Sequence, residues 1–348
     1  MPESEKISVA LMTHADGAHV SAYITALAAS DVCESVVLSD PDGRWDAEAK
    51  RKLGDRLKAV YRNHEQMLAR EQPTLALITY EARLAPQIIL HALRANCHVF
   101  AEKPSCVRVA DFEPLVREAD SRHRHLMLAL ANRLNPEAMH ARRLIARGEI
   151  GKVYGLEMHL VADQTRLTRK SYQQQWFTQK ARAGGGHLIW LGIHWLDLAM
   201  HVTDASITSV SGFTANVGGQ PIDVEDSAAA ALQFDDGFLG TVTSGYYLDK
   251  GYHSHIKIWG SKGWLHLAAM RERPLHWSTT KGPASGKIQE FTQSKDPRGY
   301  TPYVHAALRA AAGLADPPIS NAHSLRALKT VFAIYDSAES GKRVNVTQ

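Results

Sequence analysis

The stretch that decides the fold is residues 7–29, ISVALMTHADGAHVSAYITALAA. Its first part, 7–12, is apolar and predicts a buried strand, whereas 19–29 has the small and apolar residues of a helix that packs on a sheet. The polar turn between them lies where a dinucleotide-binding fold places its phosphate loop. This order predicts the first unit of a parallel, doubly wound sheet.

The same alternation continues to about residue 130. We expect further strands at 35–39, 75–79, 98–101 and 126–130, and helices at 45–71, 86–95 and 110–120. Strands that alternate with helices indicate βαβ units, and right-handed crossovers then place a crevice at the carboxyl ends of the strands.

After about residue 133 the pattern changes. We expect helices at 136–147, 187–201, 301–313 and 322–340, a strand at 153–162, and hairpin-like strands between 207 and 267. The polar segment 163–183 resembles a loop that lines a site. The sequence therefore predicts an α/β protein in two domains. Residues 1–133 form a Rossmann-type domain, and 134–348 form an α+β domain with a large, mostly antiparallel open sheet.

Composition excludes several classes of protein. The 348 residues are 45% hydrophobic and 22% charged, with a net charge of +4, which gives little support to a nucleic-acid surface. No apolar run approaches the ~20 residues of a membrane span, and the polar start does not resemble a signal peptide. Three cysteines without metal-binding spacing suit a reducing compartment, so we expect a cytoplasmic protein. The 18 histidines are many for this length.

The first turn is an unusual phosphate loop. In the usual G-x-G-x-x-G pattern, glycines let the backbone approach a pyrophosphate at a helix N-terminus. Here Thr13, Ala15 and Ala18 hold those three positions, and Asp16 adds a negative charge. The turn is either a divergent NAD-binding loop, in which Thr13, His14 and Ala15 contact the cofactor, or a turn that only packs helix on sheet.

Asp40 ends the second predicted strand, where a carboxylate can accept hydrogen bonds from the adenosine ribose. Such a contact favours NAD over NADP because it repels a 2′-phosphate, although Arg44 softens that preference. The alternative is an Asx turn before Pro41.

Two later stretches carry reactive side chains. Lys103, in Glu102-Lys103-Pro104, directly follows a predicted strand and is either a residue of the crevice or a surface lysine. In the glycine-opened stretch 184–197, His194 and Asp197 are three residues apart, so the carboxylate can orient the imidazole. His187, His194 and His201 recur every seven residues, which predicts one helix face but spaces neighbours too widely to share one metal ion.

These motifs resemble the glucose–fructose oxidoreductase and inositol dehydrogenase family (Gfo/Idh/MocA). The matching segments are Glu102-Lys103-Pro104, Asn132-Arg133 with Pro136, Gly184–Gly186 with Gly192-Ile193-His194 and Asp197, Gly260–Gly263, and Ser337–Val344. The resemblance implies NAD(P)-linked oxidation of a sugar or polyol, with Lys103 and His194 as catalytic residues. The cofactor contacts we expect are Thr13, His14, Ala15, Asp40, Thr79, Tyr80, Glu102, Lys103 and Asn132. The substrate contacts we expect are Lys103, Trp176, His187, Trp190 and His194.

Three departures mark a divergent member of that family. Trp190 replaces the family aspartate four residues before the histidine, the phosphate loop lacks its glycines, and Tyr80 replaces the usual proline after Thr79. Trp190 is suited either to stacking on a sugar face or to plain packing.

The leading hypothesis is an NAD-dependent dehydrogenase acting on a secondary hydroxyl, in which His194 transfers the proton and Lys103 assists. One alternative is a glycoside-cleaving enzyme that recycles NAD through oxidation and elimination. Another is a non-catalytic ligand-binding protein. We expect no metal in the site, because a hydrolytic centre of His14, His19 and His187 has little support. The resemblance also implies a homodimer or homotetramer, with the region 246–258 contributing.

Overall fold

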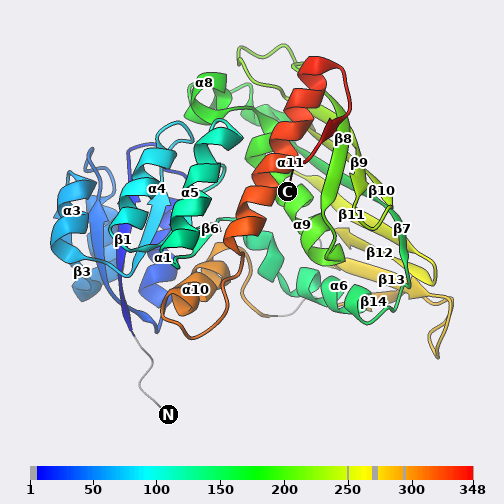
Figure 1. The fold of residues 1–348 in the computed structure, drawn as a ribbon, viewed down its shortest axis with the longest axis horizontal. Coiled ribbons are helices and arrows are strands. Elements are labelled where there is room, and N and C mark those ends of the chain that lie inside the picture. The colour runs from blue at the N-terminus through cyan, green and yellow to red at the C-terminus, as the bar shows by residue number, and fades with distance from the viewer. Residues whose placement is uncertain (1–5, 249–250, 269–272, 293–294, 348) are drawn as a thin grey trace. The chain divides into compact units, whose positions relative to one another are not determined.

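The computed structural model describes residues 6–248, 251–268, 273–292 and 295–347 (Figure 1). The chain forms two compact units. The first comprises Met1–Ala131, Ala181–Gly184 and Pro297–Leu325, and the second comprises Asn132–Lys180, Gly185–Asp296 and Arg326–Gln348. No helix in the described part of the chain is long and apolar enough to cross a membrane.

The first unit is built on a six-stranded sheet in the order β3-β2-β1-β4-β5-β6, with every pair parallel. Its strands are β1 (Ile7–Thr13), β2 (Cys33–Ser39), β3 (Leu57–Tyr61), β4 (Leu75–Thr79), β5 (His98–Ala101) and β6 (Leu126–Leu128). Its helices include α1 (Val20–Ala29), α2 (Asp46–Leu53), α3 (His64–Glu71), α4 (Ala85–Arg94), α5 (Val109–Ser121) and α10 (Tyr300–Ala311). This strand order confirms the predicted Rossmann-type doubly wound sheet.

The single long helix predicted over 45–71 is wrong. The segment contains α2, a short 3₁₀ turn, the edge strand β3 and α3. β3 lies at the edge of the sheet beside β2, and its residues alternate between half-buried and exposed. The charged residues around it match a helical period, but pairing with the sheet edge decides the structure, as tertiary context often overrides local propensity.

The second unit holds a nine-stranded sheet in the order β14-β13-β12-β11-β7-β10-β9-β8-β15. β7 and β10 are parallel and the other pairs are antiparallel, so the predicted, mostly antiparallel open sheet is confirmed. Its strands are β7 (Val153–Asp163), β8 (Ile207–Ala215), β9 (Ser227–Phe234), β10 (Leu239–Leu248), β11 (His253–Gly260), β12 (Gly263–Ala268), β13 (Leu275–Thr279), β14 (Gln289–Phe291) and β15 (Val344–Asn345).

Helices α6 (Pro136–Ala146) and α9 (Ile193–Thr203) belong to the second unit, and α11 (Asn321–Ser340) begins within the first. The sequence suggests a single boundary near residue 133, but the chain returns to the first unit at Pro297–Leu325. Two contacts fasten that return: the Tyr303 hydroxyl donates to the carbonyl oxygen of Leu128 at 2.9 Å, and the Leu128 amide donates to Ser324 at 3.1 Å.

Candidate active site

The carboxyl ends of β1, β2, β4 and β5 share one edge of the six-stranded sheet, because all four strands run in the same direction. That edge gathers the predicted cofactor residues of the first unit. Asn132 lies in the second unit, at the start of the chain that follows the sheet.

The phosphate loop is shaped around Thr13 and Gly17. The Thr13 side chain is buried, and its hydroxyl lies 3.4 Å from the carbonyl oxygen of Thr79. A Cβ at Gly17 would clash with Oγ1 of Thr13, so the loop uses a glycine one position from where the family pattern places it. The Thr79 hydroxyl donates to the carbonyl oxygen of Ala18 at 2.6 Å and closes the turn onto β4. Sequence reasoning missed Gly17.

The start of α1 fits an anionic group. Its N-cap residue, His19, does not cap the helix with its side chain. Nδ1 of that histidine lies 3.1 Å from the Glu102 carboxylate. Amide groups at an uncapped helix N-terminus favour phosphate. The residues present therefore fit the pyrophosphate of a dinucleotide.

Two carboxylates follow β2, a buried one at Asp40 and an exposed one at Asp42, where the sequence predicts a role for Asp40 alone. Asp40 is 0% exposed, and its oxygens accept the amides of Asp42 at 3.2 Å and Trp45 at 2.8 Å. The contact with the Asp42 amide is that of the Asx turn that the sequence offers as the alternative to ribose binding. Asp42 is exposed and accepts the amide of Ala15 at 2.8 Å, so the carboxylate on the phosphate loop is one that sequence reasoning missed.

His14 and Tyr80 form the wall beside this loop, with ring centroids 5.0 Å apart. The carbonyl oxygen of His14 accepts a hydrogen bond from the indole N–H of Trp45 at 3.0 Å. Burial lowers the pKa of His14, although Glu81 and other carboxylates oppose the shift. Glu81 itself is buried and ion-paired with Arg182 of the same unit, a link between distant segments that no local pattern showed.

Lys103 lies two residues beyond β5 and is 1% exposed. Burial lowers its pKa to about 8, against the raising effect of Glu102. Glu102 is also buried, and it lies within hydrogen-bond distance of His19 and the Tyr23 hydroxyl. Burial alone would raise the pKa of Glu102, but His19, Lys103 and Tyr23 together hold it below its ordinary value. The prediction that Lys103 directly follows a strand is thus confirmed, and its surroundings are a buried ionic cluster.

In the second unit, Glu225 organises the start of the helix that carries His194. Its carboxylate accepts the amides of Gly186 at 2.6 Å and Leu188 at 2.9 Å, and the Tyr335 hydroxyl at 2.8 Å. A Cβ at Gly186 would clash with the carbonyl oxygen of Glu225, which explains that glycine. Sequence reasoning missed Glu225, because it lies almost forty residues from the helix it caps.

The helix predicted over 187–201 is not α-helical throughout. Leu188–Gly192 is a π-helical turn, and α9 starts at Ile193. His187 contacts β10, where Nδ1 lies 2.7 Å from the Ser244 hydroxyl and the ring packs edge-on against Tyr246 at 4.4 Å. His201 contacts Arg142 of α6. The expected single histidine face is therefore broken by the wide turn, a feature that often marks functional sites.

Trp190 and Trp176 belong to an aromatic cluster. Trp190 is 8% exposed and stacks on Phe177 with ring centroids 4.5 Å apart, and Trp176 meets its edge at 5.3 Å. Trp176 is itself buried. These contacts favour the packing alternative for Trp190.

His194 is half-buried in the first turn of α9, and Asp197 lies one turn later. Asp197 receives a bidentate ion pair from Arg133, with Nε at 2.7 Å and Nη2 at 2.5 Å, and both side chains are buried. An orienting contact from Asp197 to His194, as the sequence suggests, would have to share oxygens that Arg133 already occupies.

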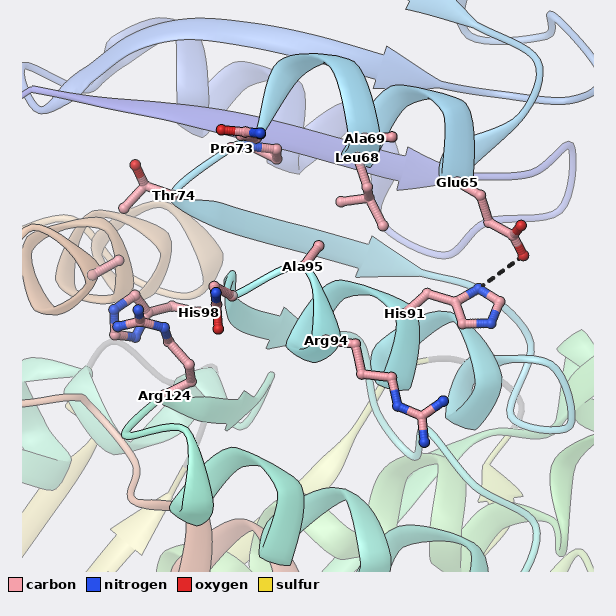
Figure 2. A pocket seen from close by; sticks show the side chains of 13 residues that line it. Glu65, Leu68, Ala69, Pro73, Thr74, His91, Arg94, Ala95, His98 and Arg124 are labelled. Carbon is pink, nitrogen blue, oxygen red and sulfur yellow. Dashed lines mark ion pairs between the residues drawn. The ribbon is translucent and has the colours of Figure 1, made fainter.

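A separate hollow lies elsewhere in the first unit. Figure 2 shows this groove of about 910 Å³ in the first unit, where His91, His98 and Arg124 are among the lining residues. Thr74 and His98 stand at the amino ends of β4 and β5, which is the opposite edge of the sheet from Lys103. The buried ionic cluster around Lys103 therefore lies at the other edge of the sheet from this groove.

Residues 13–130 match the description "Oxidoreductase family, NAD-binding Rossmann fold", and residues 138–266 match "GFO/IDH/MocA C-terminal domain". The chain belongs to the Gfo/Idh/MocA family. It is accordingly an NAD-dependent oxidoreductase, and the expected cofactor is confirmed.

Relatives of this Gfo/Idh/MocA protein extend over nearly its whole length. It is 25% identical to D-glucoside 3-dehydrogenase of Escherichia coli, over 95% of this chain and 94% of the relative. It is 21% identical to myo-inositol 2-dehydrogenase of Thermotoga maritima, over 90% and 92%. Levoglucosan dehydrogenase, solved with NADH and levoglucosan, has the same fold, with a TM-score of 0.87 at 19% identity over 99% of this chain and 100% of that one.

Proposed function

We propose that this oxidoreductase oxidises a secondary hydroxyl of a sugar, polyol or related carbohydrate with NAD, using His194 as the proton-transfer residue and Lys103 as its assistant. The observation that carries the proposal is the buried lysine at the carboxyl edge, whose pKa lies near 8. A buried ionisable group with a strongly perturbed pKa, placed at the edge where such folds bind ligands, is a candidate for catalysis.

The two side chains suit different parts of one reaction. NAD, when bound, accepts the hydride that leaves the substrate carbon. Lys103 in its ammonium form stabilises negative charge that develops on the substrate oxygen. His194, half-buried in the first turn of α9, accepts the hydroxyl proton, since imidazole is the side chain that most often acts as a general base.

The preference for NAD over NADP rests on the end of β2. Asp40 and Asp42 place two carboxylates there, one buried and one exposed, and both repel a 2′-phosphate. In this proposal, the phosphate loop and the uncapped start of α1 hold the pyrophosphate. Tyr80 and Thr79 would then line the cofactor on the β4 side.

The substrate class follows from the relatives, which act on inositol and glucosides by name. Trp190 and Trp176 serve mainly as packing in this proposal, because their rings contact one another and Phe177. Of the second-unit residues, His187 and His194 then remain as the polar substrate contacts.

The test is a panel of polyols and glucosides incubated with NAD, followed through NADH absorbance, with His194→Ala against wild type. We expect turnover to fall by about 10²–10⁴-fold, the usual contribution of a general base, with an unchanged melting temperature. His201→Asn, on the same helix, is the matched control and should keep wild-type turnover. An unchanged rate in His194→Ala would contradict the assignment.

The same assay separates the alternatives. Product that forms without a net change in NADH would indicate internal recycling of the cofactor and overturn net oxidation as the function. A protein that binds NAD but turns over no member of the panel would favour a ligand-binding role.

A further inference from the structure

One face of the nine-stranded sheet carries a row of imidazoles. In β7, side chains alternate between buried ones such as Leu156 and Met158 and half-buried ones, so Glu157 and His159 lie on the same open face. Neighbouring strands add further histidines to that face. Five of the eighteen histidines of the chain lie in these strands: His159, His253, His255, His266 and His276.

Three of these groups converge. The antiparallel pairing of β7 and β11 sets His255 opposite His159, with ring centroids 4.7 Å apart. Nε2 of His255 also lies 3.5 Å from the carboxylate of Glu157. The ligand atoms of all three side chains lie within 4.8 Å of one another.

A fourth group adjoins them from the next strand. The His266 ring, from β12, lies edge-on to His255 with centroids 5.0 Å apart. A hollow of about 290 Å³ is lined by His159, His253, His255 and His266 among others, which leaves room for the imidazoles to turn.

We propose that Glu157, His159, His255 and His266 form a binding site for a divalent transition metal of the zinc type. Three imidazole nitrogens and one carboxylate oxygen are donors that zinc accepts in a tetrahedral site. Zinc–nitrogen bonds of ~2.0–2.1 Å require the stacked rings of His159 and His255 to rotate toward a common point. Nothing in the proposed dehydrogenation uses these residues.

The electrostatics agree with this geometry. Burial and the neighbouring imidazoles lower the pKa values of His255 and His266, the direction that favours the neutral, metal-binding form of imidazole. The ammonium of Lys257, on the same strand as His255, also lowers the pKa of both imidazoles. This ammonium lies 5.5 Å from the ring centroids of both Trp259 and Trp264.

A second group of potential ligands, His64, Glu65 and His91, borders the groove of Figure 2 and serves as a contrast. There Nε2 of His64 and Nδ1 of His91 lie 3.0 Å apart, in a mutual hydrogen bond. Glu65 has a side chain 62% exposed. Each group brings two imidazoles and one carboxylate together, and the group at the sheet has a further imidazole, His266, beside it. We therefore expect the sheet to bind the ion more tightly.

A bound ion would join β7, β11 and β12 across the sheet. Since a ligand that binds only the folded state stabilises it by mass action, zinc should raise the melting temperature in a concentration-dependent way.

The experiment uses the full chain, stripped with a chelator and dialysed against Zn²⁺, with bound metal counted by elemental analysis. Co²⁺ serves as a spectroscopic probe, because a tetrahedral nitrogen and oxygen site gives intense visible bands. We expect one ion per chain and tetrahedral Co²⁺ bands. His255→Asn should weaken binding about tenfold or more, at least as much as loss of an outer-shell partner does. His91→Asn, at the second group, should leave binding unchanged.

Glu157→Gln and His266→Asn extend the test in case His255→Asn fails to fold, and each should weaken binding in the same assay. Binding lost in His91→Asn and kept in His255→Asn would overturn the proposal. A measured content of half an ion per chain would also overturn it, and so would a visible spectrum with the bands of octahedral Co²⁺. Because the readouts are metal content and spectra, their failure is distinct from failure of the dehydrogenase assay.

Discussion

The protein buries charge in two places that differ in how the charge is matched. In the second unit, Arg133 and Asp197 form a bidentate pair in which both donors and both acceptor oxygens are used. In the first unit, Lys103 has Glu102 as its neighbour, but His19 and Tyr23 also share that carboxylate. The first arrangement resembles a structural link, whereas in the second burial lowers the pKa of Lys103 to about 8.

The comparison distinguishes a buried charge that is fixed by its partner from a buried group that can exchange a proton near neutral pH. A buried pair with complete partners holds its charges fixed, because removing either partner leaves an uncompensated ion. A lysine whose pKa is lowered to about 8 by burial gains or loses a proton close to neutral pH. We therefore expect substitutions at the Arg133–Asp197 pair to act on stability, and those at Lys103 to act on the pH dependence.

The largest effect should come from breaking the matched pair. Asp197→Ala leaves the Arg133 guanidinium buried without its carboxylate, which should lower the free energy of unfolding by about 3–5 kcal/mol. Urea denaturation measures it. The double variant Arg133→Met with Asp197→Leu should recover most of the loss, because it removes both charges together. A loss below about 1 kcal/mol in Asp197→Ala would show that the pair is not the structural link inferred here.

The next largest effect is a pH dependence of the free energy of unfolding that is caused by Lys103, and it should appear between pH 8 and 10.5. Below pH 8 the lysine is charged in both the folded and the unfolded chain. Between its folded pKa of about 8 and its ordinary 10.5, the unfolded chain binds more protons, so the free energy of unfolding rises with pH. The total rise attributable to this group is about 3 kcal/mol.

Lys103→Met should remove this increase in the free energy of unfolding between pH 8 and 10.5. Lys58→Met, at an exposed lysine of β3, is the control and should keep the increase. Turnover should fall as the pH increases through about 8, because the proposed role requires the ammonium form. Denaturation curves and rates measured on the same pH series test both statements. Turnover that increases through pH 8 would make the neutral amine the active form and contradict the proposed role.

Much of the fold could be predicted from local pattern. The strand at 98–101 and the helix starting at Pro136 agree with the structure to the residue, because apolar runs and the proline mark their limits. β3 could not be predicted, since an edge strand with exposed alternate residues carries no apolar run. The return of Pro297–Leu325 to the first unit depends on contacts such as that between Tyr303 and Leu128, which no periodicity shows.

The site could be predicted in position but not in its electrostatics. Lys103 was expected after a strand and lies there, but its low pKa comes from burial that the surrounding fold creates. Glu225 and Asp42 were missed because each acts on backbone amides far along the chain, at Gly186 and Ala15. Such pairings arise only when the chain is folded.

The smallest effect should come from the exposed carboxylate of Asp42. Asp42 accepts a hydrogen bond from the Ala15 amide at the phosphate loop. Because the carboxylate is exposed to water, this hydrogen bond should contribute about 1 kcal/mol to the free energy of unfolding. Asp42→Asn removes a negative charge from the edge where the pyrophosphate is proposed to bind, and NAD should bind about fivefold more tightly by calorimetry. Asp40→Asn, at the buried turn, is the contrast and should lower stability without tightening NAD. If Asp42→Asn weakens NAD instead, this exposed carboxylate contacts the ribose, and the role predicted for Asp40 belongs to Asp42.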